Sequence, residues 1–150
     1  MIMKRMTGIA LALTLTSCGP SAHEQLTENN RKIVADFARI FYTERDVDRA
    51  FRNYVSADHY VQHNPTIADG REAAIAVLKP LFSAPGARFD VRHIVVDGAI
   101  AVIHLRGRPS PESRGGAVAD VFRLENGKIV EHWDVLQPIP EKSANPNGAI

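Results

Sequence analysis

Two runs of alternating apolar and polar residues near the C-terminal end are joined by the dipeptide Asn126-Gly127. The runs cover residues 117–125 and 128–136, and such alternation is typical of strands that bury one face. Asn-Gly is the strongest short signal for a two-residue hairpin loop, because both residues accept a positive φ. The sequence therefore predicts an antiparallel hairpin here, and the rest of the chain has to cover its apolar face.

A two-residue loop also decides which residues of the two strands lie opposite each other. Pairing Glu125 with Lys128 places Asp120 opposite Trp133, and directly opposed residues share a face. That face also carries Phe122, so we expect Asp120 among apolar side chains. Desolvation there would raise the pKa of the carboxyl group toward the range useful for proton transfer. The alternative for Asp120 is an ordinary solvated or paired strand carboxylate.

Three amphipathic helices are expected before the sheet. Apolar residues recur with helical spacing in 28–44, where Thr27 could be the N-cap. A second, shorter helix begins at Asp46, and a third opens at Asp69 with Glu72 in the arrangement of a capping box. Consecutive amphipathic helices need a sheet on which to pack, so the fold class is α+β.

A second hairpin is predicted by the alternation in 89–106 around the turn Asp97-Gly98. The polar loop 107–116 then returns the chain to the first hairpin. If this loop closes symmetrically, His104 falls opposite Asp120. With an extended segment at 60–63, these strands form a curved antiparallel sheet with the helices on one side and a pocket on its concave face.

The first 17 residues have the features of a secretory signal peptide. Lys4 and Arg5 precede an apolar run at 6–16 that is too short to span a bilayer. The ending Leu15-Thr16-Ser17-Cys18 resembles a bacterial lipobox, which implies lipidation of Cys18. We expect a lipid-anchored lipoprotein of the bacterial cell envelope, facing the periplasm or exterior. The alternative is an ordinary signal in which Cys18 is a chance thiol.

Length and composition limit the rest of the chain to one domain. The 150 residues, 45% of them hydrophobic, suffice for one real core. We divide the chain into a signal peptide (1–17), a lipidated tether (18–27), a domain (28–138) and an extended tail (139–150). Basic and acidic side chains nearly balance and no basic run remains, so nucleic acid is not an expected partner. A single cysteine excludes a disulfide within the chain.

Several stretches together resemble the SnoaL-like polyketide cyclase branch of the nuclear transport factor 2-like superfamily. They are YVQHNP, VVDGAIAVIHLR, DVFRLENGKIVEHWDV and the tail QPIPEKSANPNG. The resemblance covers about residues 28–150 and implies a cone-shaped fold of three N-terminal helices on a curved sheet. It also implies that an aspartate in the cone acts as acid and base in an aldol ring closure without any cofactor.

The resemblance assigns expected site residues one by one. Asp120 matches the catalytic aspartate, and His104 matches a histidine that lines the same pocket. His63 and Trp133 are expected to line the cavity as well. The substrate class is then a small apolar or aromatic carbonyl compound on which Trp133 would stack.

The residues themselves add candidates for binding such a compound. The phenols of Tyr54 and Tyr60 could donate to an enolate oxygen, and Phe122 would contribute an apolar wall. His132 and Asp134 could begin a metal site, but the predicted register turns them away from Asp120, so we expect no metal.

Two readings without catalysis stay open. The domain could bind an apolar ligand or a protein partner in the same cone. It could also act as a scaffold, and a homodimer through the outer face of the sheet is expected. Cofactor-free acid–base chemistry on a carbonyl compound, by aldol cyclisation or isomerisation, is the first hypothesis.

Overall fold

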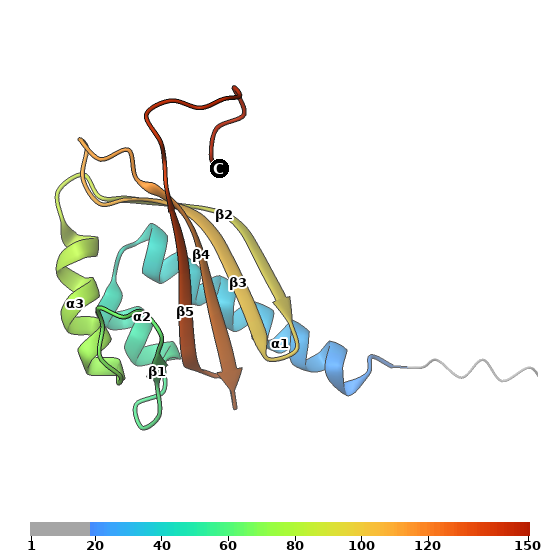
Figure 1. Ribbon diagram of the computed structural model, residues 1–150. Helices are drawn as coiled ribbons and strands as arrows, with labels where there is room; N and C mark the ends of the chain where they lie inside the picture. Colours follow the sequence, from blue (N-terminus) through green and yellow to red (C-terminus); the bar gives the residue numbers. More distant parts are fainter. Residues whose placement is uncertain (1–18) are drawn as a thin grey trace, which may run out of the picture.

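A curved sheet with helices on one face makes up the part of the chain that the computed structural model describes, residues 19–150 (Figure 1). The predicted signal peptide and the lipidation at Cys18 lie outside the described residues. The elements in order are α1 Ala22–Ala38, the π-helix η1 Arg39–Thr43, α2 Val47–Tyr54, β1 Val61–Gln62, α3 Arg71–Ser83, β2 Arg88–Asp97, β3 Ile100–Arg108, β4 Gly116–Glu125 and β5 Lys128–Pro138.

The five strands form one mixed sheet in the order β1-β5-β4-β3-β2. Strands β2 to β5 are an antiparallel meander, and the two-residue strand β1 pairs parallel to β5 at the edge. The helices α1, α2 and α3 all lie on the concave face (Figure 1). The predicted α+β fold class is therefore confirmed.

The core lies between α1 and the concave face of the sheet. Val34 and Phe37 of α1 are fully buried, and the ring of Phe37 meets that of Phe122 on β4 with centroids 5.4 Å apart. These two α1 residues are three apart and face the sheet together, as the helical spacing predicts. Among residues 19–150, no helix is both long enough and apolar enough to cross a membrane.

Helix α1 begins at Ala22, six residues before the predicted start. Ser21 is the N-cap, and its side chain and that of Glu24 form a reciprocal capping box. Residues expected in a polar tether are therefore helical, and Thr27 is no cap: its hydroxyl accepts a hydrogen bond from the Gly98 backbone, 2.8 Å away. The prediction failed because this first turn is polar and gives no apolar periodicity.

The predicted cap of α3 is also wrong. Gly70, with φ +99°, holds the N-cap position and provides no side-chain bond. Asp69 instead accepts a hydrogen bond from the backbone N–H of Gln62 at 2.8 Å. Asp69 thus holds β1 against the loop that precedes α3.

The turn of the second hairpin lies one residue later than predicted. Asp97 pairs with Ile100, and Gly98 takes the positive φ of +54° that a type II′ turn needs at its first central position. His93 then pairs with His104, and the two rings stack with centroids 5.7 Å apart. Because directly paired residues share a face, both histidines lie on the same face of the hairpin.

The pairing of β3 with β4 is offset by one residue from the pairing predicted for a symmetric loop. Gly107 pairs with Gly116, so His104 lies opposite Ala119 and Ile103 lies opposite Asp120. Gly115 makes this closure possible: it has φ +78°, and an added Cβ would sit 2.2 Å from the carbonyl oxygen of Gly107. Because side chains alternate along a strand, this offset puts His104 on the face opposite to Asp120.

The β4–β5 hairpin begins in the predicted register and then leaves it. Leu124 pairs with Ile129, but Arg123 pairs with Glu131, so Val130 is an extra residue in a bulge. From there on, Asp120 lies opposite Asp134. The predicted pairing of Asp120 with Trp133 is therefore wrong.

The segment 139–150 that follows β5 has no helix or strand, and it runs beyond the end of the sheet (Figure 1). Its first residue, Ile139, donates its backbone N–H to the oxygen of Gly115 at 3.1 Å. Further along, Arg114 donates to the carbonyl oxygen of Glu141 at 3.4 Å. The tail is thus joined to the loop between β3 and β4.

Candidate active site

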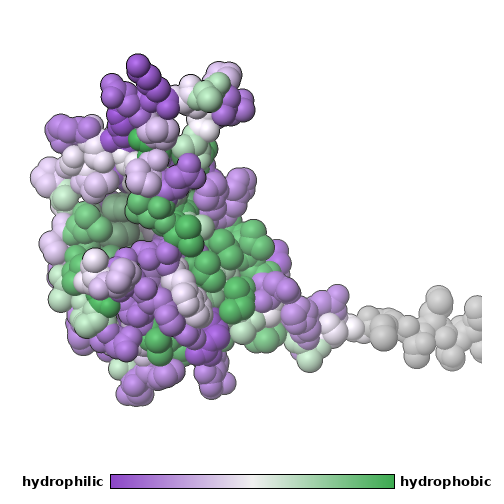
Figure 2. Space-filling model, viewed as in Figure 1, coloured by the Kyte–Doolittle hydropathy of each residue, from purple (hydrophilic) through white to green (hydrophobic). Residues whose placement is uncertain are grey.

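A cavity of about 430 Å³ lies between α3 and the concave face of the sheet. In the space-filling view a hollow bordered by hydrophobic residues is visible on the side of the molecule where α3 faces the strands (Figure 2). Most of its wall is apolar. Its polar lining residues are Tyr42, Tyr60, Asn64, Thr66, Ser113, Asp120, His132 and Asp134.

Asp120 lies in this wall, in the middle of β4, and only 8% of its surface is exposed. Both oxygens of its carboxyl group have protein partners. The Tyr42 hydroxyl donates to Oδ2 at 2.5 Å, and Nε2 of His132 lies 3.3 Å from Oδ1. A buried carboxylate between a phenol and an imidazole is an arrangement that can store and move protons.

The π-helix η1 brings Tyr42 to Asp120. Ile40, Phe41 and Tyr42 are three successive buried residues, whereas an α-helix that lies on a surface buries only a stripe. The wider π turn lets all three face the core, and such turns are frequent at functional sites. Burial, followed by the nearby charge of Asp120, raises the pKa of Tyr42 well above its usual value. The phenol therefore remains protonated and can donate.

Gln62 on β1 determines which nitrogen of His132 carries a proton. Gln62 Oε1 accepts the backbone N–H of Asn64 at 3.0 Å and lies 2.9 Å from Nδ1 of His132. Because this oxygen can only accept, Nδ1 of His132 must be the protonated donor. The ring is also stacked on Phe122, with centroids 4.8 Å apart.

The position of His132 lets it share a proton with Asp120. With Nδ1 protonated, a neutral imidazole would point the lone pair of Nε2 at Asp120 Oδ1, and two lone pairs repel each other. A hydrogen bond between the two atoms therefore needs a proton on one of them, and Asp120 and His132 form a dyad placed to share that proton.

Asp134 and Tyr60 complete the polar part of the cavity. Asp134 lies opposite Asp120 across the two strands, and its Oδ2 accepts a hydrogen bond from Nδ2 of Asn64 at 2.6 Å. Tyr60 is buried, and its hydroxyl accepts from Nε2 of Gln62 at 3.3 Å. Burial, and then the charge of Asp120, raises the pKa of Tyr60, so it also remains a neutral phenol.

A comparison with protein families matches residues 34–132 to the SnoaL-like domain. The chain belongs to the SnoaL-like family. A search of curated proteins finds no match for this SnoaL-like chain.

Solved structures with the nuclear transport factor 2-like fold resemble this SnoaL-like domain. A protein of unknown function from Mesorhizobium loti has a TM-score of 0.66 at 22% identity, covering 79% of this chain and 97% of its own. A protein from Kribbella flavida named as a ketosteroid isomerase has a TM-score of 0.62 at 16% identity, covering 81% and 85%. One from Acidithiobacillus ferrooxidans named as a polyketide cyclase has 0.56 at 17%, covering 72% and 87%. At these identities the likeness shows the fold.

The predicted site residues of the SnoaL-like chain divide between the two faces of its sheet. Asp120, Phe122 and Tyr60 line the cavity. His104 does not, because the offset at the β3–β4 loop turns it to the outer face, where it stacks on His93.

Trp133 and His63 also lie away from the cavity, where they contact each other. Their rings stack with centroids 4.7 Å apart and 8° between their planes. Nε2 of His63 lies 2.9 Å from Glu131 Oε1, and Arg123 donates to the other oxygen of Glu131 at 2.6 Å. Hydrogen bonds from His63 and then Arg123 hold the pKa of Glu131 below its usual value. The Val130 bulge placed Trp133 in this outer cluster instead of the cavity.

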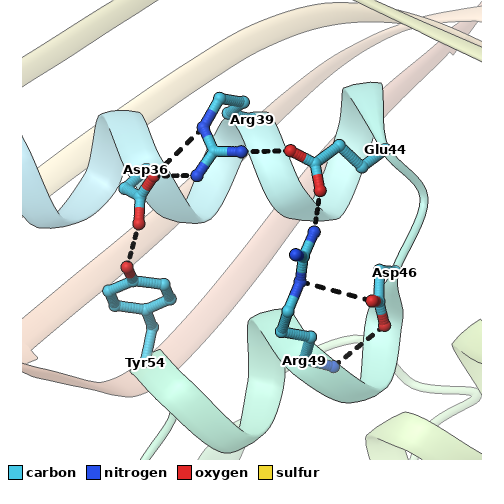
Figure 3. A network of polar contacts seen from close by, with 6 residues as sticks. All are labelled: Asp36, Arg39, Glu44, Asp46, Arg49 and Tyr54. Carbon is cyan, nitrogen blue, oxygen red and sulfur yellow. Dashed lines mark hydrogen bonds and ion pairs between the residues drawn. The ribbon is translucent and has the colours of Figure 1, made fainter.

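Tyr54 belongs to a surface network rather than to the cavity (Figure 3). Its hydroxyl donates to Asp36 of α1, and this hydrogen bond raises the pKa of Tyr54. Asp36 also binds Arg39, which in turn binds Glu44, so the network spans both ends of the π-helix η1 (Figure 3). Tyr54 is therefore a contact between α1 and α2.

Sequence reasoning did not identify Tyr42, Gln62 and Asn64, and it placed His132 and Asp134 on the wrong face. Three consecutive apolar residues at 40–42 are a sequence signal for the π-helix, because an ordinary α-helix on the surface of a sheet would not bury all three. No group of three or more histidine, cysteine or acidic side chains placed to hold a metal ion occurs among residues 19–150. The absence of a metal and of a cofactor stays a prediction.

Proposed function

We propose that this SnoaL-like domain is an enzyme that performs cofactor-free acid–base chemistry on a carbonyl compound, by aldol-type ring closure or by isomerisation. The observation that supports this most is Asp120, buried in the cavity wall and joined to both Tyr42 and His132. The apolar walls suit a hydrophobic substrate, and the polar groups are few and convergent.

The residues suit the steps of such a reaction. The Asp120–His132 dyad would remove a proton from the carbon beside the carbonyl group and later return one to the product. Tyr60 would donate to the enolate oxygen. Its hydroxyl accepts from Gln62, and among residues 19–150 its own hydrogen has no acceptor. Tyr42 would hold the carboxyl group of Asp120 in place.

The test is exchange of carbon-bound hydrogen. A panel of aromatic and alicyclic ketones is incubated with the protein in deuterated water, and loss of the proton signal beside the carbonyl is followed by NMR. We expect exchange above the buffer rate, and Asp120→Asn to reduce the enzymatic part roughly 10²- to 10⁴-fold, the usual contribution of a general acid or base.

Asp97→Asn is the matched control, because Asp97 is an exposed carboxylate at the end of β2 that pairs with His23. Exchange that is equal in wild type and Asp120→Asn would contradict the proposed chemistry. Ketones that bind without any exchange would favour the alternative of a domain that binds ligands and does not catalyse.

A further inference from the structure

The charged side chains that line the cavity all have the same sign. Asp120 and Asp134 both lie in its wall, and among the described lining residues there is no lysine or arginine. The imidazole of the described lining, that of His132, lies against Asp120, with Nε2 3.3 Å from Oδ1. A ligand with a negative group would meet two carboxyl groups there and no fixed cation, so the cavity disfavours anions.

One carboxylate oxygen in this cavity has no hydrogen-bond partner among residues 19–150. Both oxygens of Asp120 are already occupied by Tyr42 and His132. Asp134 is half-buried, and its Oδ2 accepts from Asn64, whereas among residues 19–150 no side chain or backbone group donates to its Oδ1. Oδ1 of Asp134 is therefore an acceptor on a cavity-lining residue whose carboxyl group is held by Asn64, and a ligand in the cavity can donate to it.

Aromatic rings surround the same space. Five phenylalanines and two tyrosines line the cavity, including Phe41, Phe82 and Phe122. The raised pKa values of Tyr42 and Tyr60 keep both phenols neutral, so none of these rings brings a negative charge of its own. A carboxylate beside aromatic faces is the combination that recognises organic ammonium ions.

We propose that the cavity takes an apolar ligand with a protonated amine, whose N–H donates to Asp134 Oδ1 while its carbon skeleton packs on the aromatic walls. A metal ion fits less well, because the described residues provide no group of three metal ligands and most of the wall is hydrocarbon. A hydrocarbon ligand would leave the free oxygen of Asp134 without a donor at a cost, and a neutral hydroxyl would give it a weaker hydrogen bond than an ammonium group does.

Combined with the proposed function, on which this step rests, the substrate class becomes an amino ketone. Removing a proton beside a carbonyl creates an enolate, whose negative charge would develop near two carboxyl groups. No lysine or arginine among the described lining residues offsets that charge. An ammonium group on the substrate would supply the compensating positive charge, and it would also make the neighbouring carbon–hydrogen bond more acidic.

The test compares three ligands with one skeleton: 4-phenylbutylamine, 4-phenylbutan-1-ol and 4-phenylbutanoate. Their affinities for the purified full-length protein are measured by calorimetry at neutral pH and low salt. We expect the amine to bind roughly tenfold or more tightly than the alcohol, a ratio in line with one charge-assisted hydrogen bond, and the carboxylate to bind weakest. An alcohol that binds as tightly as the amine would overturn the proposal.

Two isosteric variants then locate the ammonium group. Asp134→Asn should remove most of the preference for the amine over the alcohol and leave the affinity for the alcohol unchanged, whereas Asp97→Asn should change neither. Loss of the preference in Asp120→Asn but not in Asp134→Asn would overturn the assignment to Asp134. Binding is read without turnover, so a protein that binds amines but exchanges no carbon-bound hydrogen would contradict only the proposed chemistry.

Discussion

At the scale of single residues, Gln62 is the group on which the protonation of His132 depends. Gln62→Leu removes the acceptor of both His132 Nδ1 and the Asn64 backbone. We expect the ¹⁵N chemical shifts of His132 to lose the pattern of a ring protonated at Nδ1. Two donors left without an acceptor should also lower the free energy of unfolding by about 1–3 kcal/mol.

Gln62→Glu is the control for this prediction, because a carboxylate keeps an acceptor at the same position. It should preserve proton occupancy at Nδ1 of His132. If the histidine shifts in Gln62→Leu equal those of wild type, Gln62 does not set the tautomer.

Trp133 gives a second prediction, because it is the only tryptophan of the chain. His63 stacks on its ring, whereas Asp120 lies on the other face of the sheet. We expect His63→Leu to change the emission spectrum and Asp120→Asn to leave it as in wild type. The opposite result, a response to Asp120→Asn alone, would mean that Trp133 faces the cavity and that the bulge at Val130 is absent in solution.

The sequence allowed part of the candidate site to be predicted, and the failures have a common physical cause. Asp120 and Phe122 were placed in the cavity correctly because both lie on one strand, where the period of two is reliable. His104 and Trp133 were misplaced because each lies on a neighbouring strand, so that its position relative to Asp120 had to be inferred from the loop or turn between the two strands. An offset of one residue in that pairing moves a side chain to the other face of the sheet. Gln62 and Tyr42 act through contacts distant in sequence, which no local pattern reveals.

At the scale of elements, the loop between β3 and β4 depends on Gly115. Gly115→Ala forces a side chain into a backbone with φ +78° and against the Gly107 carbonyl oxygen. We expect it to lower the free energy of unfolding by more than about 1 kcal/mol, measured by urea denaturation. Gly19→Ala is the control, since an added Cβ there meets nothing within 4 Å. Equal stability of the two variants would show that the loop closes in another way.

Element types were easier to predict than element ends and offsets. Asn126-Gly127 identified its hairpin because a turn that needs positive φ leaves a clear signal, and Asn126 indeed has φ +49°. The bulge at Val130 left none, because valine suits a regular strand as well as a bulged one. The π-helix was read as an ordinary helix, although three consecutive apolar residues at 40–42 exceed the stripe that an ordinary surface helix buries.

At the scale of the whole molecule, the predicted homodimer would use the outer face of the sheet as its interface. Within residues 19–150 no helix lies on it, and Val95 and Val135 are 61% and 66% exposed. The homodimer stays a prediction. If it forms here, Val135→Glu should shift the sedimentation coefficient of the purified protein toward that of a monomer, because a charge would be buried without a partner. Leu26→Glu, at an exposed position on α1, should not.

The bulge at Val130 also has a consequence for the evolution of this protein. Positions 131–135 contain two alternating sets of side chains, and the bulge decides which set faces the cavity. Loss of the codon for Glu131, with the bulge at Val130 kept, would turn His132 and Asp134 to the outer face and Trp133 and Val135 to the cavity without any substitution. A lineage that carries this hairpin can therefore acquire a new pocket chemistry by one insertion or deletion, a step that comparisons based on substitutions alone would not register.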